Sequence, residues 1–396
     1  MVGLRKLGHL GGYIAVGALL VAASRTALSV ELQDTTQQAE VEAYAGATDW
    51  SIYRGNRGLR GVAAGELPAK LELLWTAEAE GAITSSPVVS DGRVYFGSDD
   101  TFLHCVDAVT GAPIWKSKTE DMIEASPMVV DGAVYIGSSD FYFYSFDAVT
   151  GELRWRQETD DRVLGSANYI RTDDGLRILV GSYDTKLYCF DPSDGALQWT
   201  YATENYINGT PALEGERVIF GGCDAKLHVV SARTGEALDR IELGVESYIA
   251  GSAALVDGRA YFGHYGNEFV CIDLDTGETL WSYASKNQAF FSAPAVTEDR
   301  VIFGGRDKQL HCVDRANGKR IWAFPTRRKV DGSPVVVGDA VVFGSGDGRM
   351  YVLDLANGEE RWRYDIGAAI ISSPAVVGGR IYVGSNDSKL YAFGSK

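Results

Sequence analysis

One stretch decides the fold: residues 85–115 read SSPVVSDGRVYFGSDDTFLHCVDAVTGAPIW, and residues 125–155 repeat them as ASPMVVDGAVYIGSSDFYFYSFDAVTGELRW. A glycine that ends an apolar run marks eight such copies, with steps of 40, 44, 40, 42, 41, 40 and 40 residues. These glycines are Gly97, Gly137, Gly181, Gly221, Gly263, Gly304, Gly344 and Gly384. A period near 40 predicts a repeat architecture.

Each copy predicts four short strands joined by tight turns. In the first copy, Asp91-Gly92 splits one pair of β-branched and aromatic runs, and Thr110-Gly111 splits a second pair. Dipeptides of this kind are hairpin signals. A unit of four antiparallel strands cannot cover its own faces, so the copies are expected to pack radially. The sequence therefore predicts an all-β fold, an eight-bladed β-propeller of four-stranded antiparallel blades.

The last copy lacks a fourth strand, because the chain reaches Lys396 shortly after Phe393. We expect residues 71–76, upstream of the first full copy, to supply the missing strand. The ring is then closed by an N-terminal strand in the last blade, which leaves no free radial edge.

Composition and charge restrict the class of protein. The chain has 396 residues, 45% of them hydrophobic, and a net charge of −16. Such a charge argues against a nucleic-acid partner, since phosphate binding depends on clustered Lys and Arg. We expect one large propeller domain over residues 49–396, acting as a monomer.

The first 48 residues have a different pattern. Residues 1–29 carry Arg5 and Lys6, an apolar run over residues 11–23 and then small residues, which is the pattern of a secretory signal peptide. The alternative is an uncleaved anchor, although the run is short for a membrane span. Residues 30–48 are predicted to be a flexible acidic linker. We therefore expect an extracytoplasmic protein, periplasmic or secreted, with no membrane span once the signal is cleaved.

The cysteines and loop aspartates are read as structural. Four of the five cysteines, all but Cys223, share one repeat position and are predicted to be inert core thiols rather than metal or redox groups. An aspartate follows the landmark glycine in seven copies, from Asp100 to Asp387. Spread one to a blade, these carboxylates cannot converge on an ion, and we expect them to accept turn amides. No metal site is predicted.

The start of each inner strand shows a regular alternation. Counting back from the proline of each copy, or from Ala167 and Ala253 where alanine takes its place, position −4 is apolar (Ile83, Ile123, Val163, Ile207, Ile249, Phe290, Val330, Ile370), and position −2 holds Ser, Ala or Gly. We expect these two rings to face the axis. Position −1 carries a hydroxyl in every copy except at Ala293. We expect the hydroxyls to tie neighbouring inner strands together rather than to act as nucleophiles, since no His recurs with them.

A tryptophan ends most copies. Trp115, Trp155, Trp199, Trp281, Trp322 and Trp362 hold this place, Trp75 holds it before the first copy, and Asp239 replaces it in the fourth, which is the expected weak blade. The segment CVDAVTGAPIW, ending at Trp115, resembles the tryptophan-docking repeat of the pyrroloquinoline-quinone (PQQ) enzymes. The resemblance covers residues 50–396 and implies that these seven tryptophans pack between neighbouring blades.

The PQQ-repeat superfamily contains both enzymes and non-enzymes. Its alcohol dehydrogenases carry an adjacent Cys-Cys pair, a Trp beneath the cofactor, a calcium site and large insertions. This sequence has no Cys-Cys, and its tryptophans are accounted for by the docking positions and Trp50. The resemblance therefore favours a BamB-like member, an exported scaffold without cofactor that binds proteins or peptides in the cell envelope. The alternatives are a PQQ-dependent, calcium-assisted dehydrogenase and a sugar-binding propeller.

The connections between blades are the least repetitive parts of the chain and are expected to surround one mouth of the axis. Acidic groups in the second and third connections lie across the ring from basic groups in the seventh, with aromatics between them. An aromatic mouth with such a charge dipole suits a peptide segment or a small anion. The alternative is that these groups are solvated or cap the core. The candidate binding residues are Asp121, Asp161, Tyr206, Tyr248, Asn287, Phe290, Phe291, Arg327 and Arg328, and no catalytic residue is nominated.

Overall fold

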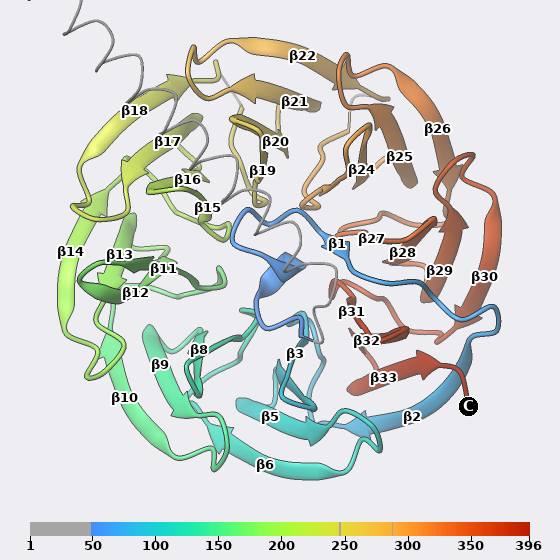
Figure 1. The fold of residues 1–396 in the computed structure, drawn as a ribbon, viewed down its shortest axis with the longest axis horizontal. Helices are drawn as coiled ribbons and strands as arrows, with labels where there is room; N and C mark the ends of the chain where they lie inside the picture. The colour runs from blue at the N-terminus through green and yellow to red at the C-terminus, as the bar shows by residue number, and fades with distance from the viewer. Residues whose placement is uncertain (1–48, 245–246, 287) are drawn as a thin grey trace, which may run out of the picture. The chain divides into compact units, whose positions relative to one another are not determined.

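The computed structural model describes residues 49–244, 247–286 and 288–396, and these form eight sheets around an axis (Figure 1). Each blade contains four antiparallel strands, so the predicted eight-bladed β-propeller is confirmed. The strands run in sequence order from the centre to the rim in seven blades, and the rim strand of the eighth comes from the N-terminal part of the chain. One sheet has a fifth strand, residues 62–63, which pairs parallel at its inner edge. The predicted signal peptide (1–29) and linker (30–48) lie outside the described residues.

The strands of each blade are named here from the axis outward. The inner strands are β3 (Val88–Ser90), β7 (Met128–Val130), β11 (Asn168–Thr172), β15 (Ala212–Glu214), β19 (Ala254–Val256), β23 (Ala295–Val296), β27 (Val335–Val337) and β31 (Ala375–Val377). The second strands are β4 (Arg93–Gly97), β8 (Ala133–Gly137), β12 (Gly175–Gly181), β16 (Arg217–Gly221), β20 (Arg259–Gly263), β24 (Arg300–Gly304), β28 (Ala340–Gly344) and β32 (Arg380–Ser385). The third strands are β5 (Phe102–Asp107), β9 (Tyr142–Asp147), β13 (Lys186–Phe190), β17 (Lys226–Ser231), β21 (Glu268–Asp273), β25 (Gln309–Asp314), β29 (Arg349–Asp354) and β33 (Lys389–Gly394). The outer strands are β6 (Pro113–Lys118), β10 (Leu153–Glu158), β14 (Leu197–Ala202), β18 (Ala237–Glu242), β22 (Thr279–Ala284), β26 (Arg320–Pro325), β30 (Glu360–Asp365) and, in the eighth blade, β2 (Glu72–Glu78).

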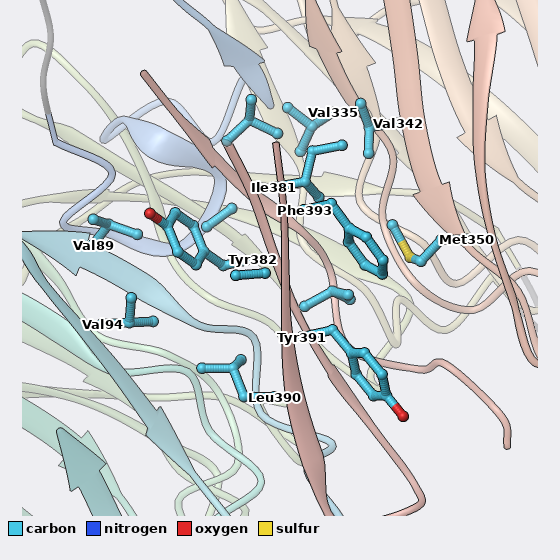
Figure 2. Close-up of a cluster of buried hydrophobic side chains, with 14 of the residues drawn as sticks. Val89, Val94, Val335, Val342, Met350, Ile381, Tyr382, Leu390, Tyr391 and Phe393 are labelled. Atoms are coloured by element: carbon cyan, nitrogen blue, oxygen red, sulfur yellow. The ribbon is translucent and has the colours of Figure 1, made fainter. Parts of the chain in front are cut away.

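The eighth blade joins the two ends of the propeller. Strand β2 pairs antiparallel with β33, and Trp75 lies opposite Ala392 in the register. The predicted closure is therefore confirmed. Figure 2 shows the apolar cluster of this blade, where Tyr382 points toward Val89 and Leu390 toward Val94, both of the first blade, and Phe393 points toward Met350 of the seventh.

The apolar ring at position −4 packs between blades, and its predicted placement at the axis is wrong. Ile123 is fully buried, and a Cβ added to Gly97 of the preceding blade would lie 2.2 Å from its Cγ2 atom. The same pairing recurs around the ring, for example between Gly384 and Ile83. Alternate residues of a strand point to opposite faces, so the axis is left to the neighbouring positions.

The hydroxyls at position −1 link the inner strands, as predicted. The backbone amide of Ser86 donates to Ser126 Oγ at 3.1 Å, and the amide of Ser373 donates to Ser86 Oγ at 2.9 Å. Equivalent bonds run through Ser166, Thr210, Ser252 and Ser333. The hydroxyl ring is defined by Ser86, Ser126, Ser166, Thr210, Ser252, Ser333 and Ser373, and it is interrupted at Ala293.

The repeated tryptophans touch the next blade. The indole of Trp115 lies against Gly151, where an added Cβ would be 2.7 Å from the ring, and its Nε1 donates to the carbonyl of Ala148. Trp281 makes the same contacts with Gly318 and Arg315. In the fourth blade, where Asp239 replaces the indole, Gly277 of the next blade meets only Ile241.

The shared cysteines are buried, and five of the seven loop aspartates accept backbone amides as predicted: Asp100, Asp140, Asp184, Asp224 and Asp347. Cys105, Cys189, Cys271 and Cys312 are buried and unpaired, and burial raises the pKa of the Cys105 and Cys312 thiols to about 12. Asp100 accepts the amides of Phe102 and Glu80, which fastens the turn between strands two and three to the preceding connection.

Candidate functional site

The two faces of the ring carry different loops. The inner strand of each blade begins at one face, which holds the connections between blades and the turns between strands two and three. We call it the connection face. The opposite face holds the two hairpin turns of each blade and is called the hairpin face. The amide of Asp99, in such a turn, donates to Ala82 O of a connection.

The segment over residues 49–63, called the plug, lies across the axis (Figure 1). Its hydrogen bonds reach the inner strands on the hairpin side of positions −3 and −1. It contains a short 3₁₀ turn, η1 (Tyr53–Gly55), and β1 (Val62–Ala63), which pairs parallel with β27. Its carbonyls accept the amides of successive inner strands, namely Val89, Val129, Leu213, Leu255, Val296 and Val336. The side-chain amide of Asn168 also donates to Arg57 O in the plug. The plug thus reaches seven of the eight blades, from the first to the seventh.

Arg54 anchors the plug. Its guanidinium is 1% exposed and donates to the carbonyls of Pro294, Ser333 and Pro334. Burial lowers the pKa of Arg54 to about 10, which leaves the guanidinium charged at neutral pH. A positive charge is therefore held close to the axis, beneath the connection face.

An axial pocket of about 180 Å³ lies on the connection side of the plug. Tyr53 of the plug lines it together with the hydroxyl ring. The residues at position −3 also line it, and these are Thr84, Glu124, Leu164, Asn208, Ala250, Phe291, Asp331 and Ile371. The pocket is blind at the plug and opens toward the connections.

Sequence reasoning missed position −3, except for Phe291. The signal was present, since this position changes chemistry in every copy while positions −4 and −2 on either side stay apolar and small. Positions −4 and −2 keep the same type of residue in every copy because they make the contact between neighbouring blades, and this contact recurs around the ring. Position −3 lines the axis, which occurs once in the molecule, so its residue type can differ from copy to copy.

Three polar groups of the pocket have distinct surroundings. Burial raises the pKa of Glu124, with Asp99 adding to the rise and Arg162 opposing it. The Asp331 carboxylate lies 2.6 Å from Lys329 Nζ and 3.2 Å from Arg306 Nε. The amide oxygen of Asn208 accepts the hydroxyl of Tyr183 at 3.0 Å.

An aromatic arc flanks the pocket mouth, defined by Tyr183, Tyr206, Tyr248, Tyr265 and Phe291. Tyr183 and Tyr206 stack with ring centroids 5.1 Å apart, and Tyr265 lies 4.5 Å from Phe291 and 6.4 Å from Tyr248. A guanidinium covers each end of the arc, with Arg162 4.7 Å above Tyr183 and Arg306 4.0 Å above Phe291. Tyr206, Tyr248 and Tyr265 remain 41–49% exposed.

The structure brings together only part of the predicted binding set. Tyr206, Tyr248 and Phe291 belong to the arc. Arg327 and Arg328 are exposed in the seventh connection, and neither guanidinium forms an ion pair with a described residue. Asn287 lies outside the described residues.

Three residues predicted to bind a partner have structural roles instead: two carboxylates form hydrogen bonds within their own connections, and one aromatic ring is in the core. Asp121 and Asp161 each accept the amide of the following residue, which turns their connections. Phe290 is fully buried, with its ring 5.2 Å from that of Phe303. Its assignment to the mouth is wrong, because it holds position −4 and points between blades while Phe291 points to the axis.

Two general properties concern the described residues alone. No group of three or more His, Cys, Asp or Glu side chains is placed there to hold a metal ion. No helix between residue 49 and the C-terminus, leaving aside 245, 246 and 287, is long and apolar enough to cross a membrane.

Comparison with known proteins adds a family and several similar folds. The family model described as outer membrane protein assembly factor BamB matches residues 68–173, 165–238, 223–322 and 306–396. The crystal structure of BamB from Moraxella catarrhalis is 21% identical over 82% of this chain and all of that chain, with a TM-score of 0.70. Quinohemoprotein alcohol dehydrogenase from Comamonas testosteroni is 14% identical over 90% of this chain and 82% of that one, with a TM-score of 0.77.

A europium-containing methanol dehydrogenase is 12% identical, covers 90% of this chain and all of its own, and has a TM-score of 0.76. Identities this low show a shared fold alone. No curated protein matches the chain.

Proposed function

The chain belongs to the family of the outer membrane protein assembly factor BamB, and from this premise we propose that it is an exported, non-enzymatic scaffold that binds proteins or peptides in the cell envelope. The observation that carries the proposal is the connection face, where exposed aromatic rings and arginines without ion-pair partners stand on a rigid ring. Aromatic residues and arginine are the side chains enriched at protein interfaces.

The charges at this face suit a partner with acidic and aromatic groups. Arg327 and Arg328 offer two guanidinium groups that no described carboxylate neutralises. The arc offers ring faces that are already held in place by stacking, so little side-chain entropy is lost on binding. An acidic segment bearing an aromatic side chain meets both requirements.

Export and tryptophan docking belong to the same proposal. Residues 1–29 have the composition of a signal peptide, and membership of a family described as an outer membrane assembly factor supports an extracytoplasmic location. We assign the seven repeated tryptophans the role of docking each blade to the next. Six of them contact a glycine of the following blade, and Trp362 donates to Leu71 O, and these contacts support that role.

The residues present do not fit a PQQ and calcium site, so we propose no cofactor. The axial pocket, at about 180 Å³, is smaller than the roughly 300–1,000 Å³ that drug-sized ligands occupy. Its floor is Tyr53 rather than a tryptophan. Its two carboxylates, Glu124 of the second blade and Asp331 of the seventh, do not form a pair, because Asp331 is bound by Arg306 and Glu124 has no partner among the described residues.

The proposal is tested by affinity capture from an envelope fraction with the full chain. Two double variants of the connection face, Arg327→Ala with Arg328→Ala and Tyr206→Ala with Tyr248→Ala, are compared with wild type. The matched control is Val109→Ala with Val149→Ala, two apolar side chains that are 61% exposed on the hairpin face. The thermal midpoint of every variant is measured in parallel.

We expect a protein that wild type and the control retain and that both connection-face variants lose, at unchanged thermal midpoints. Loss of the protein from the control variant alone would place the interface on the other face. Equal capture by all variants would refute a binding role for the arc and the arginines.

A further inference from the structure

The axial pocket has a chemistry of its own, separate from the exposed face around it. Each residue of the hydroxyl ring is at least nine-tenths buried, and each hydroxyl oxygen accepts one backbone amide. A hydroxyl retains one donor proton and one further lone pair in that state. Apart from Ser333, which is 3.1 Å from Tyr53 Oη, these hydroxyls find no acceptor for their protons among the described residues.

The mouth of the pocket adds acceptors and a further donor. The Glu124 carboxylate accepts no hydrogen bond from a described residue. The Asn208 amide oxygen is already used by Tyr183, which leaves the NH₂ group free to donate. The pocket therefore presents donors and acceptors side by side, most of them built on backbone that the ring fixes.

Ligands with a single charge fit this lining poorly. A carboxylate or phosphate would meet Glu124 and Asp331 in the wall. An ammonium group would lie close to the two cations that hold Asp331. It would also be repelled by the buried charge of Arg54, which is not part of the wall but donates to Ser333 O behind it. A neutral group that both donates and accepts satisfies the hydroxyls, the amide and the carboxylates together.

We propose that the axial pocket binds the terminal sugar ring of a saccharide. Sugar hydroxyls donate to Glu124 and accept from the Asn208 amide and the hydroxyl ring. The plug makes the pocket blind, so only a chain end enters, and the volume of about 180 Å³ suits a single ring rather than a larger ligand. Tyr206, Tyr248 and Tyr265 provide exposed ring faces beside the mouth for the apolar faces of the sugars that follow.

The proposal goes beyond protein binding at the connection face. The two are told apart by Glu124, Asn208 and Ala250, which line the pocket, whereas Tyr206 and Tyr248 are shared by both proposals. The full chain is titrated with maltotriose and with tri-N-acetylchitotriose, followed by calorimetry and by saturation-transfer NMR. Acetate and methylamine are the charged probes. Glu124→Gln and Asn208→Ala each remove one direct contact, and Ala250→Trp fills the mouth without removing a hydrogen bond. The matched control is Glu278→Gln, which makes the same chemical change at an exposed turn of the hairpin face.

We expect one of the trisaccharides to bind, with its terminal ring receiving the strongest saturation transfer. Loss of one bond to a charged group makes binding about tenfold weaker in Glu124→Gln, and Ala250→Trp abolishes it, while Glu278→Gln binds as wild type. Failure of both saccharides to bind, binding that survives Ala250→Trp, or tighter binding of acetate or methylamine than of sugar overturns the proposal. If Ala250→Trp does not fold, equal affinities of wild type, Glu124→Gln and Asn208→Ala overturn it as well.

Discussion

Trp281 and Trp199 hold the same repeat position but have different surroundings, which makes their alanine variants a test of how the blades are held together. Trp281 is 7% exposed, its Nε1 donates to the carbonyl of Arg315 at 2.9 Å, and its ring faces Gly318 of the next blade. Trp199 is half-buried, and its buried Nε1 has no hydrogen-bond partner among the described residues.

Removing a buried tryptophan costs about 3–5 kcal/mol of unfolding free energy, and we expect Trp281→Ala to fall in that range. A net hydrogen bond contributes about 1 kcal/mol, and removing an unpartnered buried N–H relieves a penalty. Trp199→Ala should therefore destabilise less than Trp281→Ala, by about 1 kcal/mol or more. Urea unfolding of the full chain, followed by tryptophan fluorescence and by circular dichroism, measures the difference.

Equal losses from the two variants would refute the reasoning that the indole hydrogen bond adds to packing between blades. A larger loss from Trp199→Ala would refute it more strongly. The comparison is valid only where the two spectroscopic probes give coincident transitions.

Three further predictions concern the ring. Deleting residues 72–78 should lower the thermal midpoint and expose the edge of β33, because β2 is the only described strand that pairs with that edge. An unchanged midpoint would show that β2 is not needed to close the ring. Asp239→Trp should raise the midpoint, since Gly277 meets only Ile241 atoms 3.5–3.9 Å away, and a lower midpoint would show that the fourth blade has no room for an indole. Burial alone would raise the pKa of Asp100, but hydrogen bonds from His104 and from the Glu80 amide lower that pKa to about 2. A carboxylate with a depressed pKa stabilises the fold above its unfolded pKa, so the free energy of unfolding should fall between about pH 4 and about pH 2. Asp100→Asn should make this fall less steep. An identical slope of unfolding free energy against pH in the variant and wild type would contradict the assignment.

The blades could be predicted from the sequence because each is a local unit. Hairpin signals such as Asp91-Gly92 fix two strands within a few residues, and the period repeats that information eight times. The closing strand could be inferred by counting, since one copy was short of a strand.

The pocket could not be predicted in the same way. Alternation along the inner strand separates Ile123 from Glu124 but does not say which of them faces the axis, because both faces are covered in the ring. The plug carries no repeat and no strand pattern, and its place depends on carbonyls that any residue supplies. Arg54 is therefore buried without a signal in its own neighbourhood that indicates it.

The order of synthesis makes the plug and the closing strand unusual. Both leave the ribosome before the blades they join, and Trp362 Nε1 must find Leu71 O across 291 residues, while Arg54 must find Ser333 across 279. Contacts so distant along the chain raise the contact order, and a high contact order slows folding. Because β2 pairs with β33, the edge of β2 has no partner until the last blade has been synthesised, and we expect the ring to close only then.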